Sequence, residues 1–79
     1  MRQIEIYSTQ QCPFCVRAKA LLDSIGLAYR EIDVSADHNI LQRMIKRSGQ
    51  RTVPQIFIDG ESVGGYEQLS RLALSGGLA

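Results

Sequence analysis

The sequence contains few of the residues that cross-link or stiffen small proteins: its 79 residues include no tryptophan, two prolines, two cysteines and one histidine. Two cysteines are too few for the several disulfides that usually hold small secreted proteins together, and with one histidine they cannot complete a four-ligand zinc site. The longest apolar runs are a handful of residues, far below the roughly 20 that a membrane-spanning helix requires. We therefore expect no disulfide-rich scaffold, no membrane contact and no resident metal.

The sequence also lacks an excess of charge of either sign. Nine basic and eight acidic residues give a net charge of +1, and 44% of the residues are hydrophobic. This balance is typical of an ordinary globular domain and does not supply the basic surface that nucleic-acid binding needs. The first residues enter a strand-like pattern directly, without an apolar signal region, which predicts a cytoplasmic protein. We expect a monomer in which residues 1–79 form a single domain.

The alternation of apolar and polar residues predicts seven elements in the order βαβαββα. Pro13 suits the first position of a helix, and Asp59-Gly60 suits the turn of a two-residue hairpin. The first two strands should pair in parallel, so we expect an α/β fold with a four-stranded mixed sheet and helices on both faces. The last residues, 75–79, are expected to fray. Strands are predicted at 2–8, 27–34, 53–58 and 61–63, and helices at 13–25, 37–48 and 66–75.

The motif that carries chemistry is Cys12-Pro13-Phe14-Cys15. Cys12 lies at the N-cap of the first predicted helix, where free N–H groups and the helix dipole favour a thiolate; the stretch 7–22 adds two cations and no acid. Cys15 follows one turn later, facing inward, where it can attack a mixed disulfide held on Cys12. We interpret the pair as a redox dithiol. A pair of metal or cluster ligands and an inert structural disulfide are the alternatives.

Together with two further motifs, this dithiol resembles the glutaredoxins. Thr52-Val53-Pro54 precedes the third predicted strand, and Gly64-Gly65 opens the last predicted helix. The resemblance covers essentially the whole chain. It implies a thioredoxin-like fold and the reduction of protein disulfides, glutathione mixed disulfides and low-molecular-weight disulfides. Glutathione would be the reducing co-substrate, with no tightly bound cofactor.

On this interpretation Cys12 is the nucleophile and Cys15 is the resolving thiol. The expected partners are disulfide-bonded or glutathionylated proteins, such as ribonucleotide reductase, and a separate NADPH-dependent reductase that recycles glutathione. Two alternatives remain open. One is a thioredoxin-like donor that a flavoenzyme recycles. The other is an iron–sulfur carrier, in which Cys12 and glutathione from two protomers hold a [2Fe–2S] cluster.

The resemblance further implies a glutathione-binding groove. Pro54 corresponds to the family's cis-proline, and it holds Val53 extended so that the backbone of Val53 can pair with a bound peptide. Gly65 leaves the next two N–H groups free at a helix N-terminus, which suits a carboxylate. Arg51, with Gln50, is expected to bind the second carboxylate. A plain strand start and an unliganded turn are the alternatives for these segments. The predicted groove residues are Phe14, Arg51, Thr52, Val53, Pro54, Gly65, Tyr66 and Glu67.

The sequence departs from the family pattern in three respects, at four positions. Thr9 stands where many members carry lysine, so the thiolate is less stabilised unless a nearby arginine compensates. Phe14 replaces the usual tyrosine and keeps the groove wall without its hydroxyl. Tyr66 and Glu67 stand where a small residue and aspartate are common, which crowds or reshapes the γ-glutamyl pocket. The basic residues Arg43, Lys46, Arg47 and Arg51 are interpreted as a solvated face, with docking of acidic partners as the alternative.

Overall fold

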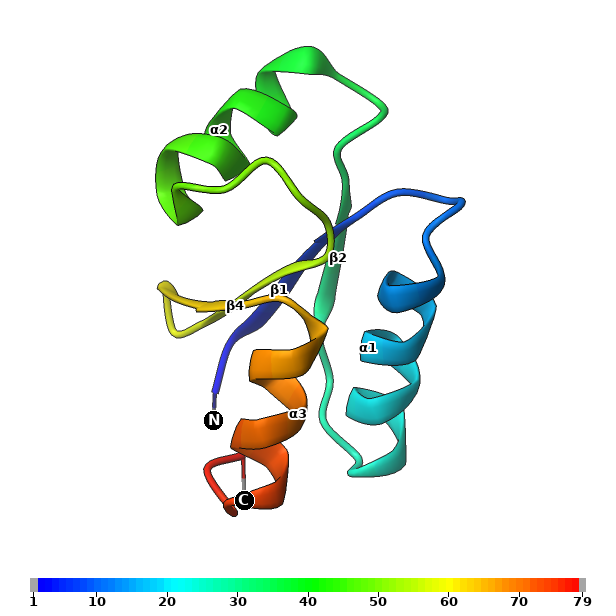
Figure 1. Cartoon of the computed structure of the whole chain (residues 1–79), viewed down its shortest axis with the longest axis vertical. Helices are drawn as coiled ribbons and strands as arrows, with labels where there is room; N and C mark the ends of the chain where they lie inside the picture. Colours follow the sequence, from blue (N-terminus) through cyan, green and yellow to red (C-terminus); the bar gives the residue numbers. More distant parts are fainter. Residues whose placement is uncertain (1, 79) are drawn as a thin grey trace.

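A computed structural model describes residues 2–78, and within them the predicted order of elements is confirmed (Figure 1). The four strands form one mixed sheet in the order β2-β1-β3-β4. None of the helices in this part of the chain has the length and apolar character that a membrane crossing needs. The strands are β1 Ile4–Ser8, β2 Arg30–Asp33, β3 Gln55–Ile58 and β4 Glu61–Gly64, and the helices are α1 Pro13–Ser24, α2 His38–Ser48 and α3 Tyr66–Leu74.

The pairing of the strands follows the predicted topology. β1 runs parallel to β2 and antiparallel to β3, and β3 pairs antiparallel with β4. Asp59 and Gly60 connect β3 to β4 with φ values of 52° and 85°. Two consecutive positive φ values are what a type I′ turn requires, and this turn matches the twist of a two-residue hairpin. The hairpin prediction is therefore confirmed.

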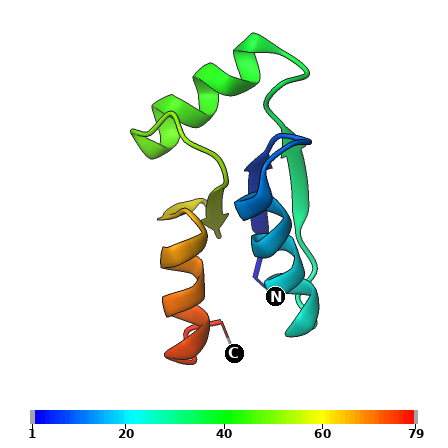
Figure 2. The same ribbon diagram turned by 45° about the vertical axis from the view of Figure 1, so that its right-hand side comes forward.

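Helices cover both faces of the sheet, as predicted. Figures 1 and 2 show α1 and α3 beside one another, with α2 apart from them. Side chains alternate between the two faces along each strand, so β1 contributes to two separate apolar clusters. One cluster joins the sheet to α1 and α3 through the buried residues Ile4, Ile6, Ala18, Leu22, Ile56, Leu69 and Leu78. The other joins it to α2 through Tyr7, Val34, Met44 and Phe57.

Arg47 belongs to this second cluster rather than to a free basic face. Its guanidinium lies 4.0 Å from the centroid of the Phe57 ring and donates a 2.9 Å hydrogen bond to the Tyr7 hydroxyl. It also pairs with Glu5 at 3.2 Å. The predicted basic face therefore loses Arg47, whose charge is committed to holding α2 on the sheet.

Three predicted strands begin later than the sequence pattern indicates. The first starts at Ile4 instead of residue 2. The second starts at Arg30 instead of residue 27, although Leu27 and Tyr29 still contact the core. The third starts at Gln55 instead of Val53, because Pro54 has no N–H to contribute to the sheet. The backbone of Val53 consequently lies outside the β-ladder.

The prediction that the last residues fray is wrong for the part that the structure describes. Backbone N–H groups of Gly76 and Gly77 donate to the carbonyls of Ala73 and Leu72 at 3.2 and 2.9 Å. Leu78 is only 5% exposed and joins the cluster beneath α1 and α3. Ala79 lies outside the described residues. The glycines suggested a loose end, but their flexibility lets the chain turn back and bury a leucine.

We expect Leu78→Ala to lower the free energy of unfolding by about 2–5 kcal/mol, the range typical of a buried leucine truncated to alanine. The matched control is Leu74→Ala, because Leu74 is 86% exposed. Its effect should stay within about 0.5 kcal/mol, as for most surface substitutions. Urea denaturation followed by circular dichroism measures both. Equal destabilisation by the two variants would show that residue 78 does not contribute to the core.

Candidate active site

Cys12 lies at the N-cap of α1, directly after the turn that leaves β1. Its backbone is extended (φ −131°, ψ 105°), Pro13 occupies the first helical position, and no acidic residue lies in the first turn. The Cys12 sulfur accepts a hydrogen bond from the backbone N–H of Cys15 at 3.2 Å. A sulfur in this position faces the positive end of the helix dipole.

Cys15 has the opposite environment. It is completely buried, whereas Cys12 is half-buried, and both are free thiols. Burial raises the pKa of Cys15 to about 12, and its hydrogen bond with the Cys12 side chain acts in the same direction. The backbone of Thr9 and the charge of Lys19 lower this pKa, but by less. Cys15 therefore keeps its proton throughout the neutral pH range.

A groove of about 280 Å³ adjoins the dithiol. Seven of the eight residues that the sequence analysis assigned to glutathione binding line it, and the eighth, Arg51, does not. Gln68 also lines the groove and was not predicted. The lining residues are Phe14, Thr52, Val53, Pro54, Gly65, Tyr66, Glu67 and Gln68.

Two aromatic rings form one wall of this groove. The centroids of Phe14 and Tyr66 are 6.2 Å apart, and Phe14 is 52% exposed, so its ring faces the open space rather than the core. Tyr66 packs in addition against the core cluster under α3. The guanidinium of Arg17 lies 5.3 Å from the Phe14 centroid. Arg17 therefore covers the aromatic wall, a contact that the sequence analysis did not anticipate.

The segment before β3 contacts both the groove and Cys12. The Val53–Pro54 peptide bond is cis, as the family resemblance implies. The Val53 carbonyl oxygen lies 3.7 Å from the Cys12 sulfur, within range of a thiol hydrogen bond. Val53 also lines the groove, whereas neither Cys12 nor Cys15 is among the lining residues, so Val53 is the link between the groove and the Cys12 sulfur.

The N-terminus of α3 forms another side of the groove. Gly65 is the N-cap, and its N–H donates a 2.9 Å hydrogen bond to the side-chain oxygen of Gln68. The first-turn N–H groups of Tyr66 and Glu67 have no partners within the helix, as at any helix start. A glutamine three residues after a helix N-cap is a known capping signal, so the role of Gln68 was open to prediction.

Gln55 holds the loop between α2 and β3. It is 1% exposed, and its amide nitrogen donates to the side-chain oxygens of Gln50 and Thr52 at 3.0 and 3.2 Å. Since the side-chain oxygen of Gln50 accepts from Gln55, its amide nitrogen is left as a hydrogen-bond donor. Arg51 is exposed and lies between Gln50 and Thr52, which Gln55 anchors. Sequence reasoning missed Gln55, because a glutamine in a short strand gives no sign of which polar groups the fold brings beside it.

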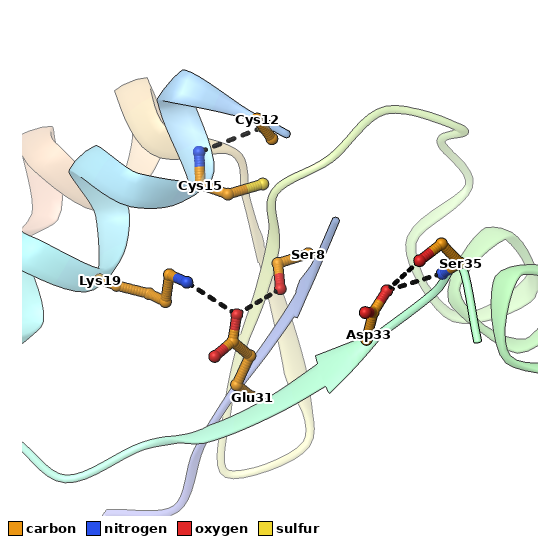
Figure 3. Close-up of polar contacts among 7 residues, drawn as sticks. All are labelled: Ser8, Cys12, Cys15, Lys19, Glu31, Asp33 and Ser35. Carbon is orange, nitrogen blue, oxygen red and sulfur yellow. Dashed lines mark hydrogen bonds and ion pairs between the residues drawn. The ribbon is translucent and has the colours of Figure 1, made fainter. Parts of the chain in front are cut away.

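A polar network lies behind the dithiol (Figure 3). One carboxylate oxygen of Glu31 accepts hydrogen bonds from Lys19 at 2.8 Å and from the Ser8 hydroxyl at 2.7 Å. The hydrogen bond from Lys19, followed by that from Ser8, holds the pKa of Glu31 below its usual value, and Glu31 raises the pKa of Lys19. The sequence analysis described surroundings without an acid, because residues 7–22 contain none. In the folded protein, Glu31 of β2 lies beside this segment and contacts Lys19 and Ser8.

The side chains in residues 2–78 include no group of three or more His, Cys, Asp or Glu placed to hold a metal ion. The two thiols of the site differ in exposure: the Cys12 sulfur is half-buried at a helix N-cap, and the Cys15 sulfur is buried one turn behind it.

We expect iodoacetamide at pH 7 to alkylate Cys12 and to spare Cys15. With a pKa of about 12, Cys15 is nearly all thiol at pH 7, and its reactivity should rise about tenfold per pH unit below that value. The Cys12→Ser protein should therefore react at least about 100-fold more slowly than the Cys15→Ser protein. Intact-mass measurements on the two variants decide this, and similar rates would contradict the assigned environments.

Comparison with known proteins identifies the family. Residues 4–63 match the family model for glutaredoxin. The chain is 47% identical over 78 residues to glutaredoxin 3 of Escherichia coli (strain K12), covering 99% of this chain and 94% of that protein. The solution structure of a Brucella melitensis glutaredoxin has a TM-score of 0.83 at 45% identity, with 96% of this chain and 83% of that chain covered. The crystal structure of a buckwheat glutaredoxin–glutathione complex has a TM-score of 0.86 at 29% identity, with coverages of 95% and 71%.

The strand order, the position of the dithiol and these similarities agree with one another. The chain belongs to the glutaredoxin family, has its thioredoxin-like fold and is a thiol–disulfide oxidoreductase.

Proposed function

We propose that this protein is a glutathione-dependent reductase of protein disulfides, glutathione mixed disulfides and low-molecular-weight disulfides. The observation that carries the proposal is the position of the Cys12 sulfur, 3.7 Å from a carbonyl oxygen of Val53, which lines the groove. A peptide thiol held in that groove has its sulfur beside the nucleophile. The buckwheat relative was crystallised as a complex with glutathione, which supports glutathione as the occupant.

Glutathione carries a carboxylate and an ammonium group at its γ-glutamyl end, a carboxylate at its glycine end and a thiol between them. The groove and the exposed loop before it in the sequence offer a partner for each part. The N–H groups at the start of α3 suit the γ-glutamyl carboxylate, and Glu67 suits its ammonium group. The backbone of Val53, which lies outside the β-ladder, suits pairing with the central peptide units. Arg51 and the Gln50 amide, on the loop anchored by Gln55, suit the glycine carboxylate.

In the first step the Cys12 thiolate attacks one sulfur of the substrate disulfide. A bond from Cys12 to that sulfur forms, the substrate S–S bond breaks, and the second substrate sulfur leaves as a thiolate that takes a proton from water. The half-buried Cys12 is the accessible sulfur for this attack. Its position at the N-cap also makes it the better leaving group later, because the helix start stabilises its negative charge.

The mixed disulfide on Cys12 has two routes forward. Cys15 can attack Cys12, which releases the reduced substrate and leaves a Cys12–Cys15 disulfide that two glutathione molecules reduce. Alternatively, glutathione attacks the mixed disulfide directly. The raised pKa of Cys15 makes the first route depend on ionising a buried thiol, whereas the second does not involve Cys15. Glutathionylated substrates should therefore proceed without Cys15, and protein disulfides should need it.

We further propose that residues 1–79 act as a single monomeric domain in the cytoplasm. The oxidised glutathione would return to a separate NADPH-dependent reductase. Its protein substrates would be disulfide-bonded or glutathionylated proteins, with ribonucleotide reductase as one candidate. The exposed Phe14, which lines the groove, and the exposed Val16 two residues later in α1 offer apolar contact area for such substrates.

We expect Cys12→Ser to abolish both activities in an assay coupled to glutathione, glutathione reductase and NADPH. Cys15→Ser should slow the reduction of a protein disulfide by about tenfold or more, because intramolecular resolution is lost. The same variant should keep deglutathionylation within about threefold of the parent. A Cys12→Ser protein that still turned over would refute the nucleophile, and equal loss of both activities in Cys15→Ser would refute the two-route scheme.

We expect Arg51→Ala to raise the KM for glutathionylated substrate by about three- to tenfold with kcat little changed, because a charge-assisted contact to the carboxylate is lost in ground and transition states alike. Arg43→Ala, which removes an exposed cation from α2, is the matched control and should leave KM unchanged. Equal effects would assign both residues to general electrostatic attraction instead of a carboxylate site.

A further inference from the structure

Lys19 occupies a position that the dithiol scheme leaves unused. It lies four residues after Cys15 on α1, so the two side chains are neighbours on the same face of the helix. Figure 3 shows both side chains leaving α1 on the side that faces the sheet. Lys19 therefore places a positive charge behind the buried sulfur, on the side away from Cys12.

The structure holds this lysine in place from two other elements. Glu31 of β2 accepts a hydrogen bond from its ammonium group at 2.8 Å, and Ser8 of β1 donates to the same carboxylate oxygen at 2.7 Å. Ser8 is 1% exposed, so its hydroxyl is a fixed support for the carboxylate. A lysine side chain is otherwise flexible, and anchoring it removes the freedom that would let it turn to solvent.

Stability alone does not account for the arrangement. The side chains of Lys19 and Glu31 are 27% and 42% exposed, and ion pairs as accessible as this contribute little to the free energy of folding. The cluster is, however, well suited to influence Cys15. The charge of Lys19 lowers the pKa of Cys15, opposing the effects of burial and of Cys12, and the ionised sulfur in turn favours the charged lysine. Tyr29 and Asp33 are the other titratable groups near this network.

We propose that Lys19 is a positioning residue for the resolving step, held behind Cys15 by Glu31 and Ser8, and that it stabilises the Cys15 thiolate while that thiolate attacks the mixed disulfide. The proposal rests on the proposed function in one respect, namely that Cys15 resolves the mixed disulfide. It adds three residues, from α1, β1 and β2, to the machinery of that step.

The chemical balance of the step defines what Lys19 can affect. Cys15 loses its proton to water, its sulfur bonds to Cys12, the bond from Cys12 to the substrate sulfur breaks, and the departing thiolate takes up a proton. In this step Cys12 remains in a disulfide, Cys15 is oxidised and the substrate sulfur is reduced. Over both exchange steps together, the substrate gains two electrons and the Cys12–Cys15 pair loses them. Cys15 is a neutral thiol before the step and part of a neutral disulfide after it. A fixed cation behind Cys15 therefore lowers the barrier without shifting the equilibrium.

This reasoning separates an electrostatic role from a structural one. In Lys19→Met, closing of the Cys12–Cys15 disulfide and its reopening by glutathione should both slow by about three- to fourfold. A pKa one unit higher leaves about tenfold less Cys15 thiolate, and the higher nucleophilicity of that thiolate offsets about a factor of three. The equilibrium with a glutathione redox buffer, and hence the reduction potential, should stay unchanged. Damage to α1 would move the potential, because it would change the relative stability of dithiol and disulfide.

The experiment follows the closing step by rapid acid quench and intact-mass analysis after mixing the reduced protein with a protein disulfide. Lys19→Arg should restore most of the rate, since it keeps the charge. Glu31→Gln should slow closing by about two- to threefold, because the lysine loses its charged anchor. Lys46→Met, which removes an exposed cation on α2, is the matched control and should close at the parent rate.

A second measurement places the effect on Cys15 itself. In a Cys12→Ser background, Lys19→Met should slow alkylation of Cys15 by the same factor at every pH between 8 and 10. In a Cys15→Ser background, the same substitution should leave deglutathionylation unchanged. If Lys19→Met closes at the parent rate, or shifts the potential as much as the rate, the proposal is overturned. If Cys15→Ser itself leaves protein-disulfide reduction intact, the proposed function fails instead.

Discussion

The hydrogen bond from the backbone N–H of Cys15 to the Cys12 sulfur is the interaction on which the site depends. It exists because β1 ends at Ser8 and the chain turns into a helix whose first residue is Pro13, leaving Cys12 as the N-cap. The same turn that satisfies a helix N-terminus thus presents a sulfur to the positive end of the helix dipole. A serine or aspartate would cap the helix as well, but neither can exchange disulfides.

The two thiols differ in exposure, because Cys12 lies at the end of α1 and Cys15 lies on the face of α1 that packs against the interior. Cys12 precedes the first turn, and its half-buried sulfur lies 3.7 Å from the carbonyl oxygen of Val53, which lines the groove. Cys15 points into the interior, where burial raises its pKa to about 12. Two identical side chains three residues apart therefore acquire unlike reactivities from their surroundings alone. Cys12 is therefore the more accessible sulfur, and Cys15 stays protonated in the neutral pH range.

The groove is supported by polar side chains that do not belong to the dithiol motif. Gln68 holds the N–H of Gly65 and so shapes the start of α3, and Gln55 ties the loop before β3 to Gln50 and Thr52. Each of these glutamines fixes a backbone segment from which several neighbouring N–H or side-chain groups project. Because these groups are already held in place, the protein loses less conformational entropy when a ligand binds to them.

Local sequence determined the features that local chemistry controls: the N-cap thiol, the hairpin at Asp59-Gly60, the order of the elements and the inward turn of Cys15. These depend on residues within about one helical turn or one tight turn of each other. Tertiary structure alone decided that Glu31 of β2 meets Lys19 of α1, and that Leu78 returns to the core. Such contacts join segments far apart in the chain, and no local pattern encodes which of them the folded sheet will bring together.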